Sequence, residues 1–138
     1  MAWHGGCACG AVRYEVDGPA FNRTLCHCVD CRRTSGAPAF AWFSVRTDAL
    51  RWTAAPPLVR RSSPGVERGL CAQCGTALTW QSDASRDEID VATGSLDDPE
   101  LAPPSDHTFA SQRLSWLPID DGLPRYPRTR AEGPGPGG

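Results

Sequence analysis

The chain contains no lysine, so all 14 of its basic residues are arginines, and they are outnumbered by 16 acidic residues. The formal net charge is −2, and the isoelectric point is about 5.9. Non-specific binding of nucleic acid depends on clustered positive charge. A mildly acidic chain is a poor candidate for that role, so we expect no nucleic-acid partner.

Long hydrophobic runs are also absent. The longest, APAFAWFSV at 37–45, is far shorter than the roughly 20 apolar residues of a membrane-spanning helix. The opening segment MAWHGGCACG has neither the basic nor the apolar region of a signal peptide. We therefore expect no membrane partner and a cytoplasmic location, where thiols stay reduced. The seven cysteines are then expected to bind metal or take part in catalysis rather than form disulfides.

Long helical patterns are scarce, because 13 prolines and 14 glycines divide the chain into short segments. Alternation of apolar and polar residues predicts a half-buried strand at 11–16. Apolar segments at 39–45, 77–80 and 88–93 predict further strands. The clearest helix start is SLDDPE, with Ser95 as N-cap, and it predicts a turn or two at most. We expect a mainly β protein.

The length of 138 residues and the hydrophobic fraction of 40% are sufficient for one domain with its own core. We place this single domain at 1–130. Within it, 48–68 is predicted to form strand fragments interrupted by turns at APP and SPG. The last segment, 131–138, reads AEGPGPGG and has too little apolar content to pack, so it is predicted to be a disordered tail.

The seven cysteines fall into three groups, which suggests a division into four plus three. The groups are Cys7 with Cys9, then Cys26, Cys28 and Cys31, and finally Cys71 with Cys74.

The first and last groups together supply four thiols. CAQCGT at 71–76 has the spacing of a zinc knuckle, and Gly75 suits a turn that needs a positive φ. Cys7 and Cys9 are two positions apart, so on an extended segment their side chains would point the same way. Four thiolates form a closed, structural zinc site. Such a site would tie the start of the chain to its middle and stabilise the fold.

The middle group supplies only three thiols, Cys26, Cys28 and Cys31. Three protein ligands leave the fourth position of a zinc ion open, which is the arrangement of catalytic zinc. Soft sulfur ligands favour a further thiolate, so a substrate thiol bound there would lose its proton. Arg32 and Arg33 follow directly and could offset negative charge or hold a substrate carboxylate.

Other arrangements remain open from the residues alone. His27 or His107 could complete the middle group and make it structural. The three thiols could instead act as a redox sensor without metal. A different group of four cysteines could also form the four-thiol site, namely Cys7, Cys9, Cys26 and Cys28.

The cysteine motifs belong to a longer ordered set of segments, which reads GGCACGAVRYEV, CHCVDCRRTSG, CAQCGTAL, TGSLDDP and SWLPIDDGLPRY. In these segments, across roughly residues 4–126, the chain resembles the glutathione-dependent formaldehyde-activating enzymes. The wider family also includes centromere protein V. The resemblance implies a β-tent fold, in which small antiparallel sheets lean together. It also implies two zinc ions per chain, a structural one at Cys7, Cys9, Cys71 and Cys74 and a catalytic one at Cys26, Cys28 and Cys31.

The activity implied by the resemblance joins formaldehyde to glutathione, which is formally a carbon–sulfur lyase reaction. The expected partners are therefore a small thiol and a small aldehyde. The segment after the open site would line the substrate pocket, so its candidate substrate-binding residues are Arg32, Arg33, Ser35 and Gly36. The alternatives are a non-catalytic, zinc-stabilised binding module and a thiol redox sensor. The oligomeric state is not predicted.

Overall fold

The structure is a computed structural model that describes residues 2–133. Two compact units make up the chain. The first consists of Met1–Phe21 with Phe43–Ala102, and the second consists of Asn22–Trp42 with Pro103–Gly138. That 1–130 forms one domain stays a prediction. Most of the predicted tail at 131–138 lies outside the described residues.

The first unit contains a three-stranded antiparallel sheet with the order β1-β2-β5. Its strands are β1 (Trp3–Gly6), β2 (Arg13–Val16) and β5 (Leu50–Trp52). Tyr14 and Val16 of β2 are buried, whereas Arg13 and Glu15 between them are partly exposed. This alternation in burial confirms the strand that the sequence pattern predicts at 11–16.

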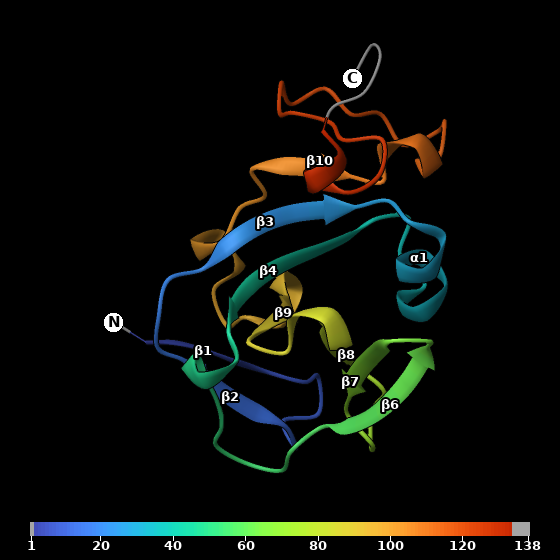
Figure 1. Cartoon of the computed structure of the whole chain (residues 1–138). Helices are drawn as coiled ribbons and strands as arrows, with labels where there is room; N and C mark the ends of the chain where they lie inside the picture. The colour runs from blue at the N-terminus through green and yellow to red at the C-terminus, as the bar shows by residue number, and fades with distance from the viewer. Residues whose placement is uncertain (1, 134–138) are drawn as a thin grey trace. The chain divides into compact units, whose positions relative to one another are not determined.

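A second set of strands in the first unit pairs in the order β9-β8-β7-β6 (Figure 1), and its neighbouring strands are antiparallel. A positive φ of 76° at Gly65 makes the turn between β6 and β7, where SPG predicts one. The strands are β6 (Leu58–Ser63), β7 (Val66–Leu70), β8 (Ala77–Ser82) and β9 (Glu88–Ala92), with β4 (Phe40–Arg46) beside β9. The three apolar segments predicted as strands correspond to β4, β8 and β9.

The core of the first unit is a cluster of buried side chains from both sets of strands. Tyr14 is 1% exposed, and its hydroxyl lies 2.6 Å from Ser95 Oγ, so its polar end has a partner inside the core. A Cβ on Gly5 would collide with the Tyr14 ring, so glycine is required for this close approach. The buried members of the cluster are Tyr14, Val16, Phe43, Val45, Val91, Leu96 and Ala102.

The second unit is built on β3 (Phe21–Cys26) and β10 (Asp106–Thr108), which pair in parallel. This parallel pair accompanies the small antiparallel sheets that the resemblance implies, so the described strands form both antiparallel and mixed sheets. A three-residue strand such as β10 shows no hydrophobic pattern that could reveal its direction in the sequence. On the side of β10 away from β3, the Tyr126 N–H donates to His107 O at 2.8 Å. The mainly β class is confirmed.

The described residues contain one α-helix, α1 (Val29–Ser35), which the sequence analysis did not predict. Cys28 is its N-cap and accepts a hydrogen bond from the Cys31 N–H at 3.1 Å. Gly36 ends it with a φ of 76° and an N–H that donates to Arg32 O at 2.7 Å. No helix in residues 2–133 combines the length and the apolar character needed to cross a bilayer.

The helix start expected at Ser95 is wrong. Residues Thr93–Ser95 and Pro99–Leu101 form two separate 3₁₀ turns. Asp98 caps the second turn by accepting from the Glu100 N–H at 3.2 Å, whereas Ser95 Oγ donates to Ala92 O. Asp98 followed by proline is a stronger start signal than the serine upstream, because proline favours the first position of a helix.

Candidate metal centres

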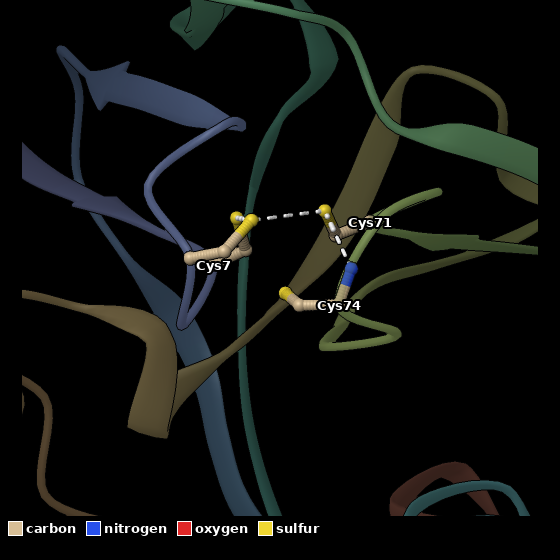
Figure 2. A group of neighbouring side chains, drawn as sticks. Cys7, Cys71 and Cys74 are labelled. Atoms are coloured by element: carbon tan, nitrogen blue, oxygen red, sulfur yellow. Dashed lines mark hydrogen bonds between the residues drawn. The ribbon is translucent and has the colours of Figure 1, made fainter.

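The sulfur atoms of Cys7, Cys9, Cys71 and Cys74 lie within 4.8 Å of one another in the first unit. The Cys7–Cys9 sulfur separation is 3.6 Å and the Cys9–Cys71 separation is 3.8 Å. Four sulfurs at about 2.3 Å from a central zinc would be about 3.8 Å apart, so the group fits a tetrahedral zinc ion. Figure 2 shows the sulfur atoms of three of these cysteines directed toward one space. All seven cysteines are free thiols.

Two glycine-containing turns hold this four-cysteine site. The Gly10 N–H donates to Cys7 O at 3.2 Å, and Gly10 has a φ of 81°. Cys7 and Cys9 therefore lie on a turn, and the extended segment expected for them is wrong. The Gly75 N–H donates to Cys71 O at 2.9 Å with a φ of 77°, which confirms the predicted knuckle turn.

Hydrogen-bond donors favour the thiolate state of two sulfurs of this site, those of Cys7 and Cys74. The Val12 N–H donates to Cys7 Sγ at 3.2 Å and lowers the pKa of the Cys7 thiol. The hydroxyl and backbone of Thr76 lower the pKa of Cys74 to about 5. Thiolate is the form that binds metal, so these donors favour metal binding. The site packs against Val12 and Leu78, which are buried in the same cluster.

Gly75→Ala is expected to destabilise the protein by about 1–2 kcal/mol, because its left-handed backbone conformation disfavours a Cβ. No atom lies within 4 Å of that Cβ, so the effect is one of conformation and not of collision. Urea unfolding measures it. Gly94→Ala is the matched control, since Gly94 also faces open space but has an ordinary φ. Equal stability of the two variants would contradict the prediction.

The second candidate site lies where β3 meets α1. Cys26 ends the strand, Cys28 caps the helix and Cys31 lies in its first turn, and their sulfurs lie within 4.8 Å of one another. Cys26 and Cys31 are buried, whereas Cys28 is partly exposed. The neighbouring sulfurs of Cys28 and Cys31 raise the pKa of the Cys26 thiol. Three adjacent thiols cannot all ionise without a cation among them, so this donor set suits a metal ion.

No histidine or carboxylate within residues 2–133 joins these three cysteines as a further ligand. The alternative in which His27 or His107 completes the site is therefore not what the structure shows. Both rings are buried and hydrogen-bonded to each other, with His27 Nε2 at 3.0 Å from His107 Nδ1. Burial lowers the pKa of His27 to about 4. The alternative four-thiol grouping also fails, because Cys7 and Cys9 lie with the cysteines of the knuckle.

The structure places the candidate substrate-binding residues on α1 and its end. Arg33 is exposed, and Arg32 is partly exposed with a buried Nε that has no hydrogen-bond partner among the described residues. Ser35 Oγ donates to Cys31 O at 2.6 Å and accepts from the Ala37 N–H, while Gly36 ends the helix. Ser35 and Gly36 thus shape the helix end, and their contact with substrate stays a prediction.

Gln112 is a neighbour of the three-cysteine site that the sequence analysis missed. Its Oε1 accepts a hydrogen bond from the Val29 N–H at 2.9 Å, and Val29 is the first residue of α1. The amide therefore holds the start of the helix that follows Cys28. Gln112 and Val29 are 83 positions apart, so no local sequence pattern could have identified this contact.

The protein is mainly β, and its fold gathers the seven cysteines into one group of four and one group of three. The family model described as glutathione-dependent formaldehyde-activating enzyme matches residues 2–112. A curated protein of Halomonas elongata, named provisionally as such an enzyme, is 32% identical over 133 residues, which cover 87% of this chain and 82% of that protein. The chain belongs to the glutathione-dependent formaldehyde-activating enzyme family.

A solved structure supports the fold. The crystal structure of a Rhodobacter sphaeroides protein is similar to this chain with a TM-score of 0.57 and 25% sequence identity. The similarity covers 68% of this chain and 87% of that protein.

Proposed function

We propose that this protein is a zinc-dependent carbon–sulfur lyase that combines a small thiol, glutathione or a similar compound, with formaldehyde at Cys26, Cys28 and Cys31. The observation that carries the proposal is the difference between the two cysteine groups. One group supplies four ligands and leaves no position for a substrate. The other supplies three from the described residues, so a substrate sulfur can complete the coordination.

The reaction balances without an oxidant or a reductant. A carbon–sulfur bond forms between the thiol sulfur and the aldehyde carbon, and the thiol proton ends on the former carbonyl oxygen. A zinc ion held by the three cysteines would supply a Lewis acid that lowers the pKa of the substrate thiol. Cys26 and Cys31 are buried, whereas Cys28 is more exposed, so a substrate would reach the site from the side of Cys28.

Arg32 and Arg33 are proposed to bind a carboxylate of the thiol substrate. Both lie one turn or less from Cys31 on the same helix, and guanidinium groups recognise carboxylates through two parallel hydrogen bonds. The buried Arg32 Nε without a partner is the observation in favour, since a buried donor is normally paired. Ser35 and Gly36 would act by ending the helix directly after the arginines.

The four-cysteine group is proposed to hold a second, structural zinc ion. Its ligands come from two turns on separate parts of the first unit, which a bound ion would join. A cytoplasmic location, and the absence of nucleic-acid and membrane partners, stay predictions.

The function is tested by measuring zinc and adduct formation on untagged protein. Elemental analysis should give about two zinc ions per chain. Carbon-13 NMR with labelled formaldehyde should then show faster formation of the hydroxymethyl thioether of glutathione than in buffer. S-methylglutathione is the matched control, because it keeps both carboxylates but has no free thiol.

Two zinc ions per chain without any acceleration would contradict the enzyme proposal and favour a zinc-stabilised binding module. One zinc ion per chain, with two of the thiols of Cys26, Cys28 and Cys31 lost to a disulfide on mild oxidation, would favour the redox sensor instead.

A further inference from the structure

A buried chain of hydrogen bonds links the middle of the three-cysteine motif to the surface of the second unit. His27 lies between Cys26 and Cys28 and is fully buried, and its Nε2 is 3.0 Å from His107 Nδ1. His107 is 2% exposed, and its Nε2 is 2.8 Å from Asp121 Oδ2. This series of hydrogen bonds ends at Asp121, whose side chain is 44% exposed.

Asp121 is held in a fixed orientation. Its Oδ1 accepts the Leu123 N–H at 3.0 Å, and its Oδ2 faces His107. These two hydrogen bonds lower the pKa of the Asp121 carboxyl, first through the Leu123 N–H and then through His107. An ionised carboxylate can only accept, so His107 Nε2 must carry the proton of that hydrogen bond.

While both imidazole rings are neutral, the carboxylate acceptor at Asp121 determines which nitrogen donates in each hydrogen bond of the series. If His107 carries its proton on Nε2, its Nδ1 is a lone pair that accepts from the Nε2–H of His27. The remaining nitrogen, His27 Nδ1, then has no proton. That nitrogen is buried and has no hydrogen-bond partner among the described residues, which fits a lone pair better than a donor.

The same elements position the cysteines. The His27 N–H donates to Thr108 O at 3.0 Å, so the ligand segment is attached to β10 through both its backbone and its side chain. β10 is in turn held by the His107 N–H, which donates to Pro124 O at 2.9 Å. Residues 121–126 therefore support β10, and β10 supports the segment that contains Cys26 and Cys28.

We propose that Asp121 and His107 are positioning residues for the three-cysteine site, and that Asp121 fixes the Nε2–H tautomer of His107 and, through it, that of His27. Neither residue belongs to the groups of candidate metal ligands. They act by holding His27 in one orientation, so that Cys26 and Cys28 on either side of it keep the spacing of metal ligands. The claim that these residues position metal ligands rests on the proposed function. The claim about the tautomers of His27 and His107 does not depend on it.

Asp121→Asn gives a specific test. The amide oxygen can still accept from Leu123, and the amide nitrogen then faces His107 Nε2 as a donor. His107 must change to the Nδ1–H tautomer, and His27 must follow. Nitrogen-15 NMR of the imidazole groups should show Nε2–H for His27 and His107 in the natural protein and Nδ1–H for both in the variant. The exposed His4 is an internal reference.

Asp120→Asn is the matched control, because it removes the same charge one residue earlier and should leave both tautomers unchanged. An Nδ1–H tautomer of His27 in the natural protein would overturn the inference. So would a His27 tautomer that Asp121→Asn leaves unchanged, since a carboxylate with a purely structural role would not control a proton two hydrogen bonds away.

The positioning role is tested by iodoacetamide labelling of each cysteine, followed by mass spectrometry. Asp121→Asn should increase the labelling rate of Cys26 and Cys31 about tenfold, because the loss of a residue that supports metal ligands weakens metal binding by about tenfold or more and leaves the thiols unprotected. Cys7 and Cys71 should be labelled at an unchanged rate. Unchanged labelling of Cys26 and Cys31 would overturn the positioning role. Because labelling does not require turnover, this outcome is distinct from failure of the proposed enzyme activity.

Discussion

Cys28→Ser is expected to lower the zinc content from about two ions to about one per chain and to reduce adduct formation at least 100-fold. A serine hydroxyl stays protonated near neutral pH and is a poor zinc ligand. Serine is nevertheless a favoured N-cap, so the variant keeps the cap that Cys28 provides for α1. The loss of activity would therefore come from the missing ligand and not from a missing helix. Elemental analysis and carbon-13 NMR measure both effects.

Thr34→Ser on the same helix is the control for Cys28→Ser. Thr34 is exposed, and its hydroxyl donates to Asp30 O, a hydrogen bond that serine can also make. The control should keep both zinc ions and full activity. Full turnover by Cys28→Ser would rule out the three-cysteine site as the place of reaction.

Cys71→Ser is expected to act mainly on the stability of the fold, which it should lower, and on activity only as a consequence. Cys71 is 2% exposed and packs with Val12 and Leu78, so serine would bury a hydroxyl there and remove one zinc ligand. Structural zinc in small domains contributes about 10 kcal/mol or more of apparent binding free energy. That value is comparable to the entire stability of a small protein, about 5–15 kcal/mol, so we expect the first unit not to fold. Circular dichroism and urea unfolding measure this loss.

A strong zinc chelator provides the comparison for Cys71→Ser. Chelator should destabilise the natural protein toward the level of the variant, and it should have little effect on a variant that has already lost the ion. An unfolding midpoint unchanged by Cys71→Ser would mean that the four-cysteine group does not hold a structural ion. Together with Cys28→Ser, the two variants separate the contributions of the two sites to stability and to activity.

The division of the cysteines into four and three follows from local spacing, and the structure has the same grouping. Two thiols three positions apart, followed by glycine, favour the same turn in any surroundings, and Gly75 adopts the positive φ that this turn requires. The strands at β2, β4, β8 and β9 were also predicted, since alternation or apolar runs reflect burial directly. The predictions that failed concern Ser95 and the turn of Cys7 and Cys9, and the sequence analysis missed β10 altogether.

The helix α1 shows why part of the site was missed. It has seven residues, too few to show a helical period, and its cap is a cysteine rather than a usual capping residue. The sequence predicts Cys28 as a ligand, but only the structure shows that its sulfur accepts the Cys31 N–H and caps the helix.

By itself, the sequence determined the mainly β class and the division of the seven thiols into a group of four and a group of three, because these depend on residue type and short spacing. Only the tertiary structure decided which four cysteines come together, and that His27 and His107 contact each other instead of joining the three-cysteine group. His27 and His107 are 80 positions apart, and they meet because β10 pairs in parallel with β3. Pairing between distant segments depends on the free energy of the whole fold, so no local pattern in the sequence shows it.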